Sequence, residues 1–113
     1  MAELLRNARA MITTAAGAAV LDGAASKTYT ILSVSLCNTH LTVDEDFDLY
    51  CTTANEGTPR YVYKRQSLPA LATFVHSDKI VLTASEELWV GSNSDPDDTL
   101  GIHVVVSYLV QDD

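Results

Sequence analysis

In the stretch TVDEDFDLYCTT, residues 42–53, apolar and polar side chains alternate from one residue to the next. Its aspartates and Tyr50 fall on one side of an extended chain, and Glu45 is the single charge on the other, apolar side. The apolar positions on that side are Val43, Phe47, Leu49 and Cys51. A period of two residues is typical of a β-strand that has one face in a core and the other in solvent.

The stretches around this one follow the same pattern. TYTILSVSLCN, residues 28–38, also alternates, and it predicts a buried face made by Thr30, Leu32, Val34 and Leu36. Further short runs rich in β-branched and aromatic residues follow at 60–66, 67–75, 79–85, 86–94 and 100–110, separated by turn-forming Ser, Asp and Pro. The sequence therefore predicts an all-β fold, an antiparallel, jelly-roll-like β-sandwich of about seven or eight strands. The last run, LGIHVVVSYLV, is apolar on both faces, which predicts a central strand or one covered by another chain.

The first residues leave their structure open. The spacing of Leu4, Leu5 and Ala8 fits a short amphipathic helix over residues 2–10, an extended arm fits equally well, and residues 11–21 can form an opening strand. We divide the chain into an N-terminal arm or first strand, residues 1–24, and a sandwich domain, residues 25–113. An arm would dock on a neighbouring subunit or partner through Leu4 and Leu5, with Arg6 and Arg9 meeting carboxylates.

Composition excludes several classes of function. The 113 residues suit one domain, and the formal net charge of −8, from 15 acidic against 7 basic residues, disfavours binding to the nucleic-acid backbone. No apolar run approaches the ~20 residues of a membrane span, so we expect no nucleic acid and no membrane among the partners. The N-terminal residues lack the features of a secretory signal, which predicts synthesis in the cytoplasm.

The sequence shows no catalytic motif, so we expect a non-enzyme without a cofactor. It has no nucleophile elbow and no glycine-rich phosphate loop, and His40, His76 and His103 do not form a zinc-binding pattern. Cys37 and Cys51 are expected to be free thiols.

Two acidic clusters leave a choice between solvated surface and a weak site for a divalent cation. Asp44–Asp48 begins like a calcium loop, but Leu49 stands where that loop needs glycine and Asn55 where it needs glutamate. Asp95–Asp98 is an acidic turn, which also fits either a solvated surface or a weak cation site. We favour a solvated surface for both.

The segment RYVYKR, residues 60–65, concentrates three of the seven basic residues beside two tyrosines. One interpretation is a surface that binds an acidic partner through Arg60, Tyr61, Tyr63, Lys64 and Arg65. The other is an edge strand with both tyrosines packed and the basic residues protecting the edge. Trp89 is expected in the core or at a subunit contact rather than as a platform for a sugar.

Several stretches in this order resemble small β-sandwich structural proteins of tailed bacteriophage virions. They are Leu36–Thr39, Ser67–Pro69, Lys79–Ala84, Glu87–Val90 and Val104–Leu109. The resemblance implies a non-enzymatic virion protein made in the host bacterial cytoplasm, foremost a capsid decoration or cement subunit bound to the major capsid protein or other virion proteins. A tail or head–tail accessory protein is the alternative, and a carbohydrate-binding sandwich that uses Trp89 is the runner-up from another class. We expect a homo-oligomer, preferably a trimer, with Val105 or Leu109 partly at the subunit contact.

Overall fold

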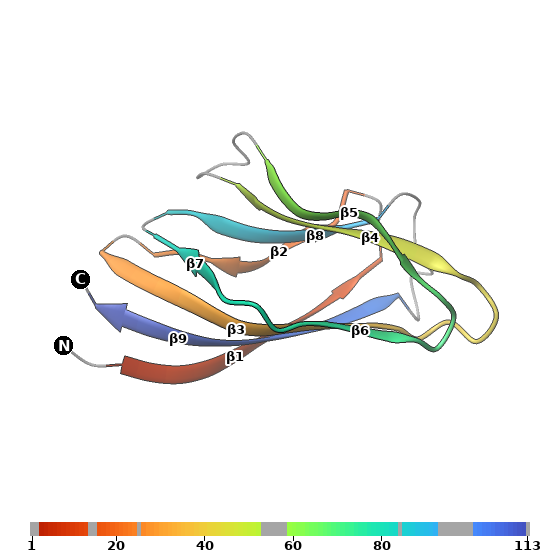
Figure 1. The fold of residues 1–113 in the computed structure, drawn as a ribbon, viewed down its shortest axis with the longest axis horizontal. Helices are drawn as coiled ribbons and strands as arrows, with labels where there is room; N and C mark the ends of the chain where they lie inside the picture. Colours follow the sequence, from red (N-terminus) through yellow and green to blue (C-terminus); the bar gives the residue numbers. More distant parts are fainter. Residues whose placement is uncertain are drawn as a thin grey trace.

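The computed structural model describes residues 3–13, 16–24, 26–52, 59–83, 85–92 and 101–112 of the chain. Within these ranges the protein consists of nine β-strands in two antiparallel sheets that face each other, without a helix (Figure 1). The all-β sandwich predicted from the alternating pattern is therefore confirmed.

Sheet 1 contains five strands. Its order is β1 (Glu3–Ile12), β9 (Ile102–Asp112), β3 (Lys27–Asn38) and β6 (Thr73–His76), and the short β7 (Ile80–Leu82) also pairs with β3. Sheet 2 has the order β2 (Ala18–Asp22), β8 (Glu87–Gly91), β4 (Glu45–Thr52) and β5 (Arg60–Leu68). If β6 and β7 are counted as one interrupted strand, this is the eight-stranded arrangement of a jelly roll, in which the chain crosses repeatedly between the sheets.

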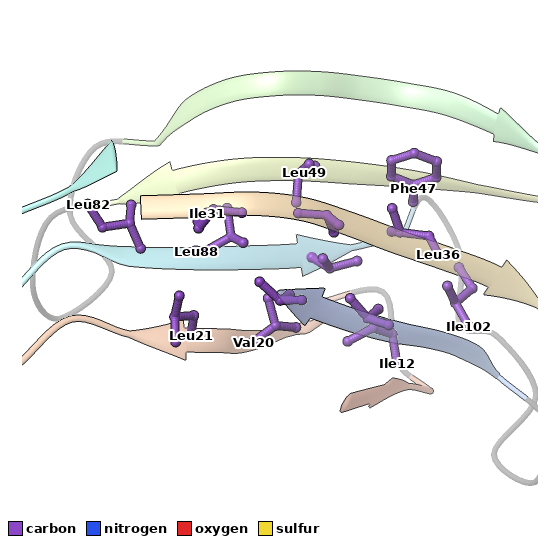
Figure 2. Packing of buried hydrophobic residues seen from close by; sticks show 14 of the residues in the cluster. Ile12, Val20, Leu21, Ile31, Leu36, Phe47, Leu49, Leu82, Leu88 and Ile102 are labelled. Atoms are coloured by element: carbon purple, nitrogen blue, oxygen red, sulfur yellow. The ribbon is translucent and has the colours of Figure 1, made fainter. Parts of the chain in front are cut away.

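The core lies between the two sheets, where β3 faces β4 and β8 (Figure 2). Phe47 and Leu49 of β4 are fully buried, as their alternation predicts, whereas Val43 precedes the strand and is 42% exposed. The other fully buried large side chains come from both sheets: Ile12, Ile31, Val34, Leu36, Leu68, Leu82, Leu88, Val90, Ile102, Val104 and Val106.

β3 departs from the predicted pattern at one point. Val34 and Leu36 are buried as expected, but Thr30 and Leu32 are not, because the pairing with β9 shifts by one residue between Ile31 and Ser33. Such a β-bulge inserts an extra residue, here Leu32, and exchanges the two faces of the strand. Tyr29 and Ile31 therefore face the core before the bulge.

The N-terminal segment is an edge strand, and the helical alternative is wrong. β1 pairs with β9 along its whole length, from Glu3 opposite Gln111 to Ile12 opposite Ile102. This pairing and the β3 pairing on its other side place β9 in the interior of sheet 1, which confirms the prediction of a central strand.

The crossing from β1 to β2 requires a glycine. Gly17 has a φ of +73°, and a Cβ atom at this position would lie 1.9 Å from the carbonyl oxygen of Val90. Any other residue would have both an unfavourable backbone conformation and a clash with the backbone of β8.

Candidate interaction surfaces

The described residues contain no cluster of three or more His, Cys, Asp or Glu side chains placed to hold a metal ion. No helix in the described part of the chain is long and apolar enough to span a membrane. Cys37 on β3 and Cys51 on β4 lie in different sheets and are free thiols, as predicted. Burial raises the pKa of the Cys51 thiol above its usual range, with a smaller contribution from the charge of Glu86, so the thiol stays protonated near neutral pH. The outer surfaces of the two sheets carry the remaining candidate residues.

The outer face of sheet 1 is defined by the strand register. Side chains that alternate with the buried ones point away from the core. The pairing places them in rows that run across β1, β9 and β3, most of which end on β6 or β7. One row consists of Leu5, Leu109, Thr30 and Val81, and another of Arg9, Val105, Ser35 and Val75. A short row of Asn7, Ser107 and Ser33 lies between these two, and the last row is Met11, His103, Cys37 and Thr73.

The outer face of sheet 1 brings together candidate residues that lie far apart in the sequence. Leu5 lies opposite Leu109, and Arg9 lies opposite Val105, so predicted residues from both ends of the chain share one surface. Leu4 and Arg6 alternate with Leu5 and project from the other side of β1, where both remain exposed. The four N-terminal residues therefore do not form a single docking patch.

Other residues of this face have no distinguishing signal in the sequence. Val75 and Val81 are 57% and 55% exposed, and Ser33 and Ser35 lie between them and β9. Locally these residues resemble ordinary outward positions of a strand. Only the pairing of β3 with β6, β7 and β9 brings them together.

The outer face of sheet 2 carries a stripe of three aromatic rings, Tyr61 on β5, Tyr50 on β4 and Trp89 on β8, which we call the aromatic stripe. The ring centroids of Tyr50 lie 5.2 Å from Tyr61 and 6.3 Å from Trp89, and the planes of Tyr50 and Trp89 are inclined by only 17°. The Nε1–H of Trp89 donates to Oε1 of Glu87 at 3.1 Å, which fixes the indole on the sheet. Trp89 thus belongs to a surface rather than to the core.

The basic segment divides between the two sides of β5. Tyr61 is 45% exposed, and the Nζ atom of Lys64 lies 4.4 Å from its ring centroid in a cation–π contact. Arg60 and Arg65 are also exposed. β5 is an edge strand of sheet 2, so the edge-strand interpretation describes its position correctly.

Tyr63 faces the other way and closes one side of the sandwich. Its ring contacts Phe47 and Phe74, and its hydroxyl group forms a hydrogen bond of 2.9 Å with Nδ1 of His76. His76 is buried, and among the described residues its Nε2 atom has no hydrogen-bond partner. Tyr63 and His76 therefore join the edge strands of the two sheets, and the structure places Tyr63 away from the exposed part of the basic segment.

The aspartates of the first acidic cluster accept hydrogen bonds from the backbone. Oδ1 of Asp48 accepts from the N–H of Arg65 at 2.6 Å, and Oδ1 of Asp44 accepts from the N–H of Ala70 at 3.0 Å. The first of these bonds supports Arg65 in its left-handed conformation, with φ of +53°. The second acidic cluster, Asp95–Asp98, lies outside the described residues.

The pKa is raised at two carboxyl groups, Asp22 on β2 and Glu45 at the start of β4. Desolvation raises the pKa of Asp22, and so do a hydrogen bond and charge repulsion from Glu87, its partner on β8. Desolvation also raises the pKa of Glu45, with repulsion from Asp46 adding to it. Oε2 of Glu45 is buried and has no hydrogen-bond partner among the described groups.

No protein-family model matches the chain, and no curated protein matches it. Solved structures do share its fold. A chain from the acid-stable capsid of Helicobacter pylori bacteriophage KHP30 aligns with a TM-score of 0.56 at 11% identity, covering 97% of this chain and 87% of that one. A chain of the infectious bursal disease virus particle aligns with a TM-score of 0.55 at 9% identity over 96% of this chain, and its Gx strain gives 0.53 at 12%.

The similarity differs in how much of each neighbour it covers. This chain spans only 30% and 32% of the two bursal disease virus chains, but most of the bacteriophage chain. At these low identities the similarity shows a common fold.

Proposed function

We propose that the protein is a non-enzymatic structural subunit of a virus particle, foremost a capsid decoration or cement subunit of a bacteriophage. The observation that carries this proposal is the match with the KHP30 capsid chain, because it covers 87% of that chain and 97% of this one. Two chains of comparable length that each form one jelly roll are compatible with the same kind of role. The resemblance of Leu36–Thr39, Glu87–Val90 and Val104–Leu109 to virion proteins of tailed bacteriophages points the same way.

A decoration subunit stabilises a shell by mass action. If it binds the assembled shell and not the dissociated one, it lowers the free energy of the assembled state in proportion to its binding. The exposed end of β5 carries Arg60 and Tyr61, whose residue types are enriched at protein interfaces, and Lys64 adds a positive charge over the ring of Tyr61. We assign the contact with the capsid protein to this end and expect it to meet carboxylates there.

The test uses particles of the virus that encodes the chain. Purified particles should contain the protein in many copies, located on the shell by cryo-electron microscopy. Particles produced without it should lose infectivity at a lower temperature and regain resistance when the purified protein is added. Absence of the protein from purified particles would refute a virion role, and a few copies confined to the tail would replace the decoration role by that of a tail accessory protein.

Variants of β5 test the proposed contact. Tyr61→Ala together with Lys64→Ala should weaken binding to stripped particles at least about tenfold, which corresponds to ~1.4 kcal/mol. Lys79→Ala, at an exposed lysine in the β6–β7 connection, serves as the matched control and should bind like the native protein. If the double variant binds like the native protein, the contact lies elsewhere on the molecule.

The aromatic stripe supports a second candidate, a carbohydrate-binding module. Rings in a row with a carboxylate beside them, here Glu87 next to Trp89, offer both stacking and hydrogen bonding to sugars. A glycan array should then show binding that Trp89→Ala abolishes. If no glycan on the array binds, the carbohydrate-binding function is contradicted and a contact within the virion explains the aromatic stripe better.

A further inference from the structure

We infer that the outer face of sheet 1 binds a second copy of this chain. The inference depends on the chain's own surface and holds whether or not the protein decorates a capsid. Its first support is the distribution of exposed apolar side chains. Five such residues share this one face: Leu5 at 70%, Val75 at 57%, Val81 at 55%, Met11 at 48% and Val105 at 40% exposed.

The second support is the charge of the face. The chain carries 15 acidic residues and a net charge of −8, yet none of the four rows from Leu5 to Met11 contains a carboxylate. Arg9 lies at the rim on the edge strand, and His103 lies opposite Met11 in the last row. Two copies of an acidic chain repel each other over most orientations, and a contact through these four rows brings no carboxylates of the rows together.

The outer face of sheet 2 makes the contrast clear. Its strands present Asp46 and Asp48 between the buried positions of β4, and Asp22 opposite Glu87 on β2 and β8. A contact between two such faces would bring carboxylates of both copies together and would cost free energy. The two faces of the sandwich therefore differ in their ability to meet another copy.

The third support is the polar chemistry between the apolar side chains. Ser33, Ser35 and Ser107 line the middle of the face. A hydroxyl group both donates and accepts hydrogen bonds, so serines can satisfy one another across a contact between identical surfaces without burying a charge. A partner whose contact surface is strongly charged would find no opposite charge here, whereas the same face of a second copy offers matching apolar and hydroxyl groups.

The size of the face indicates how the copies meet. Four strands about 4.8 Å apart and rows about 3.4 Å per residue along them give a patch of roughly 14 Å by 20 Å between the outermost Cα atoms. The side chains extend beyond this rectangle, so the copies meet through a contact at the small end of the size range of specific interfaces.

Sedimentation of the purified chain tests the inference without any capsid present. The native protein should associate into a dimer, a trimer or a larger closed ring at about 10–100 μM, and Val105→Asp or Val81→Asp should weaken that association at least about tenfold. Controls also introduce an aspartate in place of an apolar side chain of similar exposure elsewhere, Val43→Asp for Val105 and Leu71→Asp for Val81. The controls should associate like the native protein.

The folding of each variant must be measured with its association. Circular dichroism and thermal unfolding show whether an aspartate in β9 has disrupted the sheet, and Val81 on the short β7 provides a second position at less risk. Val105→Thr, which keeps the β-branched shape, should weaken association less than Val105→Asp. A native protein that stays monomeric at 100 μM would overturn the inference, and so would controls that weaken association as much as the face variants. If the chain is monomeric but Val105→Asp weakens binding to particles, the face belongs to another virion protein instead.

Discussion

At the scale of single residues, the sandwich depends on a buried amide at the end of β3. The Nδ2 atom of Asn38 donates to the carbonyl oxygens of Val43 at 2.9 Å and Leu68 at 3.0 Å, and its Oδ1 atom accepts from the N–H of His40 at 3.0 Å. The side chain is fully buried. It thus connects the end of β3, the connection to β4 and the last residue of β5.

Asn38→Ala should destabilise the protein by about 2–3 kcal/mol, because it leaves buried carbonyl groups without a donor. Chemical unfolding in urea measures the change in the free energy of unfolding. Asn7→Ala, at an exposed position of β1, is the matched control and should change stability by less than about 0.5 kcal/mol. Equal effects of the two substitutions would show that the amide does not hold the connection.

Tyr63→Phe should cost about 1–2 kcal/mol, because it removes the hydroxyl group that pairs with Nδ1 of the buried His76. The aromatic contacts with Phe47 and Phe74 remain, so the decrease in the free energy of unfolding measures the contribution of this one hydrogen bond. Tyr61→Phe, on the exposed side of the same strand, should leave the unfolding midpoint unchanged. A midpoint that also stays constant for Tyr63→Phe would mean that the ring alone closes this side.

At the scale of elements, the sequence predicts strands where one face is charged or where both faces are apolar. Phe47 and Leu49 alternate with aspartates, and β9 reads as a central strand because Val104, Val105 and Val106 are all apolar. β1 could not be assigned in this way, since Leu4, Leu5 and Ala8 fit a helical period as well as an edge strand. The bulge at Leu32 leaves no local signal, because its cause is the pairing with β9.

The candidate surfaces were predictable only in part, for the same reason. Leu5 and Leu109 can each be recognised as apolar residues with no assigned place in the core. Their position opposite each other depends on strand order, which no local pattern contains. In the sequence pattern Tyr50 falls on the polar side of its strand. Its place between Tyr61 and Trp89 follows only from the position of β4 between β5 and β8.

Deleting residues 2–10 tests the role of β1 as a strand. We expect the unfolding midpoint to fall by at least about 5 °C, because the deletion removes most of the pairing with β9 and exposes the edge of an apolar strand. Light scattering should also show aggregation. A loosely attached arm would instead leave the midpoint unchanged.

A double variant distinguishes the contribution of strand pairing to stability from the contribution of the arginine charges. Arg6→Ala with Arg9→Ala keeps the β1 backbone and removes both exposed guanidinium groups. Its midpoint should stay within about 1–2 °C of the native value, since surface charges contribute little. A fall as large as that of the deletion would assign the stabilisation to the arginines.

At the scale of the whole molecule, the excess of carboxylates predicts how stability depends on pH. The pKa values of Asp22 and Glu45 are raised in the folded state, so the folded protein holds these protons more tightly than the unfolded chain does. Their contribution is fully present at low pH and is lost as the pH rises through the raised pKa values. The thermal midpoint should therefore rise as the pH falls through the raised pKa values toward the ordinary range of a carboxyl group.

Amide substitutions provide the control for this prediction. Asp22→Asn and Glu45→Gln remove the two titrating groups and should flatten the dependence of the midpoint on pH. They should also raise the midpoint at neutral pH, modestly for Asp22 because its side chain is exposed and screened by solvent. A native midpoint that falls steadily below pH 7 would contradict the assigned direction.

The interior position of β9 has a consequence for how the protein is made. A ribosome synthesises β1 and β3 long before Ile102–Asp112, yet in sheet 1 both of them pair with that last strand. During translation the first strand therefore has no neighbour in its sheet, and its edge is open to other chains. Most of sheet 1 must form in one late step that joins distant parts of the chain, so folding is expected to be slow and to be faster than aggregation only at low concentrations of nascent protein.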